Sequence, residues 1–402
     1  MRPALILAHA FPPENLIGAY RPARFARYLP EHGFEPWVLT ASEGAAQAPR
    51  ILEVPFRYSP AELLLGKTMF PHDDRMTWIG RATKMATDWL RSFPQKPVLF
   101  STSPPLASHI VAWRLAQAFN LAWVADFRDP VVANFGRRKP LGRFADAWIE
   151  AKAVRLADAI LMNTEAAAEE LRSRYPRQAA KISALPNGFD PGDGFGPLPL
   201  PLREKRVWLH GGSIYRNRYP ERLFDGLWRL TQSGRLPLDW KIRMIGVIED
   251  MSLLERPSVR ALRERGAADI TAEHLPQKEA LREAAEADGT IVFDHYHDRG
   301  PNLAIPAKSF DCVRVGRPII AFTSPRAPLD AMLAASGVPA VRIFEEDPPE
   351  AIEEKLLAYS QQQNQFTMYS ESFRQAHSAP EQSASLARLF DRVLSAKGML
   401  RS

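Results

Sequence analysis

Residues 97–127 read PVLFSTSPPLASHIVAWRLAQAFNLAWVADF, and this stretch decides the fold class. Two short apolar runs, 97–103 and 121–127, flank a longer segment with helical periodicity. A strand, a helix and a second strand in this order are typical of parallel sheets that are covered on both faces. Because the same alternation recurs along the chain, the sequence predicts an α/β protein.

The alternation forms two series that are separated by one break. Before the break, further strands are expected at 4–10, 36–41, 159–164 and 181–187. After the break, strands are expected at 206–212, 240–246, 268–274, 289–294, 318–324 and 339–344. The break itself, PGDGFGPLPLPLREK (191–205), is rich in Gly and Pro, which interrupt helices and strands. The sequence therefore predicts two open sheets in two domains.

The length of 402 residues exceeds one ordinary core and favours two or three domains. We expect a first domain over 1–195, a second over 196–365 and a helical segment over 366–402. Four apolar residues of the last segment recur at helical spacing: Leu386, Leu389, Phe390 and Val393. This segment should therefore form a helix that packs back on the first domain.

Composition excludes several classes of protein. Hydrophobic residues make up 46% of the chain and charged residues 24%, which excludes general disorder. The single cysteine, Cys312, excludes a disulfide scaffold and fits a reducing compartment, so we expect a cytoplasmic protein. We find neither a signal peptide nor an uninterrupted apolar run of about 20 residues, so neither export nor a transmembrane helix is expected.

The net charge of +6 and the pI of about 9.4 come from Lys and Arg residues that are scattered along the chain. The dense basic tracts of nucleic-acid arms are missing, so no nucleic-acid partner is expected. The excess instead indicates attraction to anions. Phosphate-bearing small molecules and the acidic face of a bilayer are both candidates.

Ligands of open parallel sheets bind beyond the carboxyl ends of the strands, so residues that follow strands are the first candidates for a site. In the second domain, HGGSIYRNRYP (210–220) follows a strand, and its Gly211 and Gly212 permit close backbone approach. Arg216 and Arg218 come next, and Arg grips phosphate with a bidentate fork. This pattern predicts a phosphate site. A plain turn with solvated arginines is the alternative.

A second candidate is PAKSFDCVRVG (306–316), where Pro306 suits the start of a helix and Gly316 its end. Lys308 and Asp311 stand three positions apart and therefore share one helix face. An ammonium and a carboxylate presented together suit a nucleoside diphosphate, whose phosphates and ribose hydroxyls they would bind. A surface ion pair is the alternative.

In the first domain, VADFRDP (124–130) places Asp126, Arg128 and Asp129 directly after a predicted strand. These three are candidate catalytic groups, because a carboxylate there would orient or deprotonate a hydroxyl acceptor. A structural Arg–Asp pair is the alternative. Gly18, beside the start of the first helix, is a candidate for anion contact through free backbone N–H groups.

Several known motifs are missing from the sequence. There is no GxGxxG dinucleotide fingerprint, no GxSxG nucleophile elbow and no GxxxxGK[ST] phosphate loop. His9, His210 and His274 end or nearly end predicted strands, but no HExxH, paired CxxC or similar spacing suggests zinc. The sequence therefore predicts neither a metal site nor a cofactor.

Motifs in their order along the chain resemble the retaining glycosyltransferases of family four. They are FPP with a later Gly and Arg, STSPP, VADFRDP, ADAILMNTE, LPNGFD, HGGSIYRNRYP and AIPAKSFDCVRVGRPIIAF. The resemblance covers about residue 4 to about residue 325. It implies the GT-B architecture, in which two Rossmann-like doubly wound domains face each other across a cleft.

The resemblance also implies an activity. The chain would be a hexosyltransferase that moves a sugar from a nucleotide-sugar donor to a glycan or lipid-linked acceptor, with retention and without metal. Polysaccharide or glycoconjugate biosynthesis would be its setting. The second domain would hold the donor and the first the acceptor. The donor-binding residues would be Gly18, Gly212, Ser213, Arg216, Arg218, His274, Pro306, Lys308 and Asp311.

One position departs from the pattern of that family. Many members carry two glutamates eight positions apart in the C-terminal domain, whereas this chain has Leu303 and Asp311. The missing first acid keeps a non-catalytic protein that binds a sugar or nucleotide open as an alternative. An epimerase or hydrolase that acts on nucleotide sugars with the same fold is another.

A lipid-linked acceptor would bring the protein to the inner face of a membrane. Five residues would suit such peripheral contact: Arg137, Arg138, Arg143, Phe135 and Trp148. A solvated helix face is the alternative reading of these residues.

Overall fold

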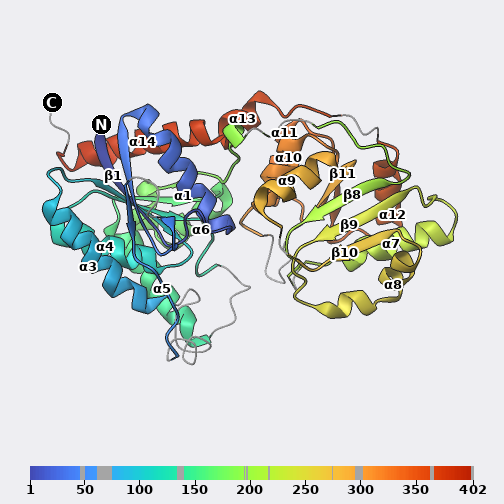
Figure 1. The fold of residues 1–402 in the computed structure, drawn as a ribbon, viewed down its shortest axis with the longest axis horizontal. Coiled ribbons are helices and arrows are strands. Elements are labelled where there is room, and N and C mark those ends of the chain that lie inside the picture. Colours follow the sequence, from blue (N-terminus) through green and yellow to red (C-terminus); the bar gives the residue numbers. More distant parts are fainter. Residues whose placement is uncertain are drawn as a thin grey trace. The chain divides into compact units, whose positions relative to one another are not determined.

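The structure is a computed structural model that describes residues 1–45, 50–60, 75–133, 140–193, 195, 198–215, 218–273, 275–294, 302–362 and 366–399. The chain divides into two compact units, which Figure 1 shows in the colours of the sequence. Unit 1 comprises Met1–Asp190 and Ala376–Ser402, and unit 2 comprises Pro191–Gln375. The C-terminal segment thus returns to the unit that contains the N-terminus.

Unit 1 is built on a seven-stranded sheet in which neighbouring strands are parallel. In spatial order its strands are β3 (Ile51–Glu53), β2 (Phe34–Thr40), β1 (Arg2–Ala8), β4 (Val98–Ser103), β5 (Trp123–Phe127), β6 (Ala159–Met162) and β7 (Ile182–Ala184). The four residues of β6 and all six of β4 are buried, which explains their continuous apolar or small composition.

Unit 2 is built on a six-stranded parallel sheet. In spatial order its strands are β10 (Ala268–Thr271), β9 (Trp240–Ile245), β8 (Arg206–Gly211), β11 (Gly289–Phe293), β12 (Ile319–Thr323) and β13 (Ala340–Phe344). This order, with the first strand of the unit at the centre, is that of doubly wound Rossmann-like folds. Two such sheets confirm the predicted α/β class.

Helices connect the strands of both units. In unit 1 they are α1 (Ile17–Tyr28), α3 (Met76–Ser92), α4 (Ala107–Phe119), α5 (Pro140–Leu156), α6 (Glu165–Arg174) and α14 (Ala379–Ala396), with the short 3₁₀ helices η1 (Leu29–His32) and η3 (Pro176–Lys181). In unit 2 they are α7 (Glu221–Gln232), α8 (Pro257–Glu264), α9 (Gln277–Glu286), α10 (Lys308–Val315), α11 (Pro328–Ser336) and α12 (Pro349–Ser360), with η4 (Pro191–Asp193) and η5 (Met251–Glu255). Helix α13 (Glu371–His377) contains the boundary between the units.

Helix α14 packs on unit 1 through the apolar face that the spacing of its residues predicts. Leu386 and Phe390 are fully buried in the core of unit 1. The Phe390 ring meets Phe34 of β2 edge to face at 5.2 Å and Phe100 of β4 at 6.1 Å. Aromatic pairs of this geometry add about 0.5–1.5 kcal/mol to the burial of the rings. The end of the chain is therefore part of the first core.

Helix α1 begins at Ile17, five residues before Pro22. Pro22 therefore lies inside the helix, where it has no N–H to donate to the carbonyl of Gly18. A side chain supplies the missing donor, because Nη1 of Arg128 bonds the carbonyl oxygen of Gly18. A tertiary contact thus makes an internal proline acceptable in this helix.

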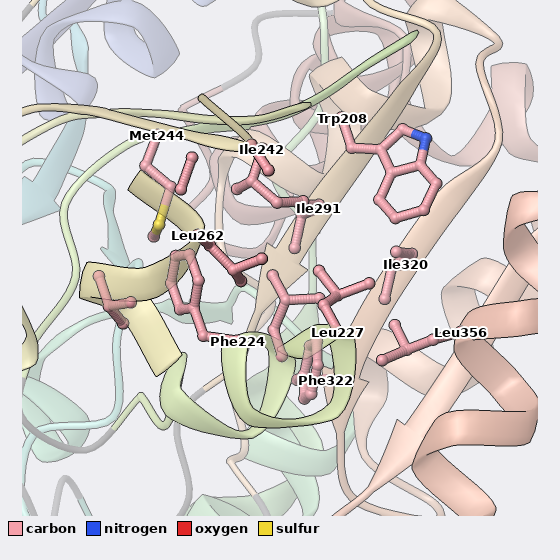
Figure 2. Close-up of a cluster of buried hydrophobic side chains, with 14 of the residues drawn as sticks. Trp208, Phe224, Leu227, Ile242, Met244, Leu262, Ile291, Ile320, Phe322 and Leu356 are labelled. Carbon is pink, nitrogen blue, oxygen red and sulfur yellow. The ribbon is translucent and has the colours of Figure 1, made fainter. Parts of the chain in front are cut away.

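The core of unit 2 lies between its sheet and helices α7, α8 and α12. In Figure 2, Trp208 and Ile291 from the strands meet Phe224 of α7, Leu262 of α8 and Leu356 of α12. Trp208 also stacks on Trp240, with ring centroids 5.4 Å apart. Burying each large side chain stabilises the fold by about 1.5–3 kcal/mol. This packing makes unit 2 a rigid base for its carboxyl edge.

Candidate functional site

Basic side chains gather at the carboxyl edge of the unit 2 sheet. The strand order reverses between β8 and β11, and doubly wound folds bind their ligands at this point. His210 is the second-last residue of β8, and Arg218 follows that strand. Lys308 is the first residue of α10, the helix that comes after β11. The topology therefore brings together residues that are far apart in sequence.

His210 links Lys308 to the centre of the sheet. Its imidazole is fully buried, with Nδ1 2.9 Å from the carbonyl oxygen of Ile291 and Nε2 2.8 Å from Nζ of Lys308. A carbonyl only accepts, so Nδ1 carries the proton and Nε2 accepts from the ammonium. Burial, with the nearby charge of Lys308, holds the pKa of His210 well below its ordinary value. The ring is therefore a neutral acceptor that positions Lys308.

Lys308 is a partly buried cation whose strongest charged neighbour is a second cation. Loss of solvent around its ammonium, followed by the charge of Arg218, holds the pKa of Lys308 well below its ordinary value. Among the described residues, Nζ of Lys308 contacts the His210 ring and forms no ion pair with a carboxylate. An anion that reaches this ammonium would remove the electrostatic penalty.

Gly212 has no side chain and therefore leaves room for the side chain of Lys308. Its φ of +133° is one that L side chains rarely adopt, and a Cβ at this residue would lie 3.1 Å from Nζ of Lys308. The amide of Gly212 donates to the carbonyl oxygen of Ile245 at 2.7 Å. This N–H is engaged in the backbone ladder, so Gly212 contributes shape and access.

Arg218 completes the cluster. Its side chain is buried, donates from Nη1 to the carbonyl oxygen of Ser213 at 2.8 Å and lies 5.1 Å from the centre of the Tyr215 ring. Burial lowers the pKa of Arg218, and the opposing influence of Tyr215 and Asp294 partly restores it. The guanidinium stays charged, because an arginine does not deprotonate in proteins.

Asp294 directly follows β11, at the same carboxyl edge of the sheet. Its buried carboxylate accepts from Nδ2 of Asn302 at 2.7 Å and from Oγ1 of Thr323 at 3.1 Å. These two donors hold the carboxylate in place, where its charge acts on Arg218. Asp294 is therefore a fixed negative group beside a basic cluster.

The other residues that the sequence predicts for donor binding lie at different places in unit 2 or outside the described residues. Ser213 presents its carbonyl to Arg218, and the carbonyl of Pro306 accepts from the amide of Ser309 at 2.9 Å at the start of α10. Asp311 lies in the first turn of α10 and is partly buried. Arg216 and His274 lie outside the described residues, as do Phe135, Arg137 and Arg138.

Asp126 of unit 1 is fully buried at the carboxyl end of β5. Arg21 donates to its two oxygens, from Nε at 3.0 Å and from Nη2 at 2.8 Å, and Thr102 donates from Oγ1 at 2.7 Å. Arg21 also donates to the carbonyl oxygens of Leu185 and Pro186. This network ties α1 and the segment after β7 to the centre of the sheet.

Arg128 donates hydrogen bonds to three carbonyl groups of unit 1. Nε donates to Ser103 at 2.9 Å, and the two terminal nitrogens donate to Gly18 and Pro104. A Cβ on Gly18 would lie 2.9 Å from Nη1 of Arg128. A side chain at position 18 would therefore have to displace the guanidinium of Arg128. Asp129, the third residue of this predicted cluster, is half-buried.

A second buried histidine lies close to Asp126 and Arg128. His109 is enclosed by two hydroxyl groups, with Nδ1 2.7 Å from Oγ of Ser101 and Nε2 2.9 Å from Oγ of Ser103. Burial lowers the pKa of His109 to about 3. The ring is therefore neutral and structural.

Sequence reasoning assigns no role to His210, Asp294 or Arg21. For His210 and Asp294 a signal exists, because each is a lone polar residue at the end of an apolar strand. Arg21 offers no such signal, because its partner Asp126 is 105 residues away in sequence.

Two further findings concern metals and membranes. Across the ranges that the structure describes, no three His, Cys, Asp or Glu side chains come close enough together to hold a metal ion. In the same ranges, every helix is too short or too polar to cross a bilayer.

Comparisons with known proteins agree with this architecture. Residues 22–193 match the family model described as Glycosyltransferase Family 4. No curated protein sequence matches the chain. The solved structure of sucrose-phosphate synthase from Thermosynechococcus elongatus is similar, with a TM-score of 0.70, 14% identity, and coverage of 98% of this chain and 100% of that one.

Two other solved structures have the same fold. WaaG, a glycosyltransferase involved in lipopolysaccharide biosynthesis, gives a TM-score of 0.58 at 16% identity and covers 100% of both chains. HepE from Anabaena in complex with UDP-glucose gives 0.59 at 11% identity and covers 99% of this chain and 98% of that one. At such identities these likenesses concern the fold.

The two parallel sheets give this chain the GT-B fold of the solved structures that it resembles. Residues 22–193 match glycosyltransferase family 4, the family that the sequence motifs indicate.

Proposed function

We propose that this chain transfers a sugar from a nucleotide-sugar donor to a glycan or lipid-linked acceptor, with retention at the anomeric carbon. The observation that carries the proposal is the pair of neighbouring cations at the switch point of unit 2, Lys308 and Arg218. Two cations in low dielectric repel each other, and a bound diphosphate reverses the sign of that interaction.

The same two cations would act on the leaving group. When the glycosidic bond to the diphosphate breaks, negative charge develops on the departing oxygens and positive character on the sugar ring. Lys308 is already oriented by His210, and Arg218 by the carbonyl of Ser213, so both stabilise that charge without reorganising. We therefore propose a transfer in which side chains, rather than a metal, neutralise the diphosphate.

Other residues of unit 2 would complete donor binding. Asp311, one turn after Lys308 on α10, would accept hydrogen bonds from the ribose hydroxyls. Uridine is the first base to test, since the HepE structure of the same fold contains UDP-glucose. Arg216, His274, Ser213 and Pro306 stay predicted contacts of the donor.

Unit 1 would hold the acceptor at the cytoplasmic side of the membrane. Asp126 and Arg128 are held by Arg21 and by backbone carbonyls, which supports a positioning role for both. Asp129 and Gly18 stay proposed contacts of the reacting groups. The Asp126 network would keep the loops after β1, β4 and β5 in one arrangement.

Thermal shift with a panel of nucleoside diphosphates tests the donor site. We expect UDP or another member of the panel to raise the Tm of the wild-type chain, by an amount that grows with ligand concentration. Lys308→Met should abolish the shift. Lys355→Met is the matched control, because Lys355 is also partly buried in unit 2 but pairs with Asp347.

Product analysis then tests the reaction. Incubation of the donor with an extract of lipid-linked and soluble glycans should release nucleoside diphosphate and give a product with the donor's anomeric configuration. Stabilisation without release would indicate a binding protein. Release or sugar conversion without acceptor would indicate a hydrolase or an epimerase. Absence of any shift across the whole panel would contradict the donor site itself.

A further inference from the structure

The outer face of helix α5 in unit 1 has a composition that a solvated helix seldom has. The helix is PLGRFADAWIEAKAVRL, and it packs beside α4, which in turn packs against α3 (Figure 1). From Gly142 onward the buried positions of α5 recur at helical spacing and include Ile149 and Ala153. The opposite side of the helix is therefore the side that faces outward.

Both acidic residues of α5 are on the inward side. Glu150 is 1% exposed and accepts from Arg174, from the hydroxyl of Tyr175 at 3.1 Å and from the amide of Val132 at 3.2 Å. Asp146 is 2% exposed. The outward side consequently carries only basic, aromatic and alanine side chains from Arg143 to Arg155.

Two aromatic rings project from this outward side. Phe144 is 77% exposed and Trp148, one turn later, is 54% exposed. Trp148 meets the buried Trp113 of α4 edge to face at 5.7 Å, and Nζ of Lys152 lies 5.0 Å from the centres of both tryptophan rings. The second ring is thus held in an outward position by its neighbours, although burying it would be favourable.

We propose that this outer α5 face, Arg143, Phe144, Trp148, Lys152 and Arg155, docks on the surface of an anionic phospholipid bilayer. Aromatic rings flanked by Arg and Lys, without acidic side chains, match the boundary between lipid headgroups and acyl chains. The cations meet phosphate groups while Phe144 and Trp148 enter the boundary region. The basic charge of this face complements an anionic lipid surface, and its two exposed rings suit the boundary region of that surface.

This inference deepens the proposed function, because contact with a membrane would favour a lipid-linked acceptor over a soluble glycan. It rests on the proposed function only for that consequence. Binding to vesicles and binding of the donor are separate measurements, so each hypothesis can fail without the other.

Vesicle flotation with the full chain tests the proposal. At low salt the wild-type chain should float with vesicles of phosphatidylcholine and phosphatidylglycerol and stay behind with phosphatidylcholine alone. The variant Phe144→Ser/Trp148→Ser should lower the partition coefficient at least about tenfold. The control Leu202→Ser/Met251→Ser changes two exposed apolar residues of unit 2 and should leave partition unchanged.

Charge variants test the basic part of the face. Arg143→Glu/Arg155→Glu should lower partition by about tenfold or more, since each basic residue near an anionic surface contributes measurably to binding. Arg260→Glu/Lys278→Glu changes the net charge equally at exposed positions of unit 2 and should have a much smaller effect. The nucleotide-induced rise in Tm should be the same in all four variants, which also shows that they fold.

Three outcomes would overturn the proposal. The first is no flotation of the wild-type chain at low salt. The second is an equal loss of binding in the α5 variants and their controls. The third is a dimer, seen by sedimentation equilibrium without vesicles, that Phe144→Ser/Trp148→Ser dissociates, because the face would then bind a second copy.

Discussion

The carboxyl edges of the two sheets hold similar residues but balance their charges differently. In unit 1, Asp126 meets Arg21 in a two-pronged ion pair, and Arg128 donates to carbonyl groups of the same unit. In unit 2, Lys308 is beside a neutral histidine and a second cation, Arg218. The charged groups of the unit 1 edge pair within the unit. At the unit 2 edge the Asp294 carboxylate acts on Arg218, whereas Lys308 contacts a histidine, and we propose that a bound anion supplies the negative partner of Lys308.

This difference supports the proposed roles, a positioning network in unit 1 and a donor site in unit 2. Both edges contain buried charge, and both follow strands at a switch point, so neither burial nor position distinguishes them. The two edges differ in the sign of the charges next to each buried cation. A buried cation that is surrounded by acceptors stabilises the fold it is part of, whereas a cation beside a cation lowers stability until a ligand arrives.

Removing the Asp126 carboxylate from the unit 1 edge should give the largest change in the free energy of unfolding. Asp126→Ala leaves the buried guanidinium of Arg21 without its carboxylate, and we expect unit 1 to lose about 3–5 kcal/mol of its free energy of unfolding. Urea denaturation, with hydrogen exchange to assign the transition to unit 1, measures this. The double variant Arg21→Met/Asp126→Leu should lose less than the single variant. A loss below about 1 kcal/mol for Asp126→Ala would contradict the balanced network.

The buried histidine of unit 1 should give the next effect, through pH. His109 has a pKa of about 3 in the folded chain and an ordinary value of 6.5 when unfolded. Between these values the unfolded chain binds a proton that the folded chain does not. The free energy of unfolding therefore falls as pH decreases below 6.5, by about 1.4 kcal/mol per pH unit for this residue.

The variant His109→Gln removes that titration while keeping a polar side chain between the two serine hydroxyls. Its free energy of unfolding should fall less steeply with acid than that of the wild type, with a relative gain of about 2 kcal/mol at pH 5. Parallel curves for the two proteins from pH 8 to pH 5 would contradict a neutral His109.

At the carboxyl edge of unit 2, removing a charge should raise the stability of the ligand-free chain. Lys308→Met removes a cation that Arg218 repels, and we expect the ligand-free chain to become about 1 kcal/mol more stable while it loses the nucleotide-induced shift. Differential scanning calorimetry with and without UDP measures both. A destabilised ligand-free variant would mean that Lys308 is structural, like Arg21 in unit 1.

Two glycines of unit 1 should give the smallest effect. Gly18→Ala adds a Cβ 2.9 Å from Nη1 of Arg128, so the gain from helix propensity is offset and the change should be destabilising by about 0.5 kcal/mol. Gly80→Ala, on α3 with no atom within 4 Å of the added Cβ, should stabilise by about 0.5–1 kcal/mol. Urea denaturation measures both changes. Equal effects would contradict the close approach of Arg128 to Gly18.

Much of the site could be expected from the sequence, but the partners of its residues could not. Lys308 and Arg218 follow apolar runs and are readily chosen as candidates. Their relation to each other depends on His210, which is 98 residues before Lys308, and on a glycine that leaves room for the ammonium. In the same way, Arg128 as a sequence feature suggests catalysis, whereas its carbonyl partners indicate positioning.

The sequence by itself determined the α/β class, the two series of strands and the apolar face of the last helix, because these depend on local periodicity and on where apolar residues recur. Only the tertiary structure decided which charges meet. Asp126 and Arg21 are 105 residues apart, and whether the acids of α5 face inward depends on the helices around it. Electrostatic effects act through space over a few ångströms, so residue order along the chain does not specify them.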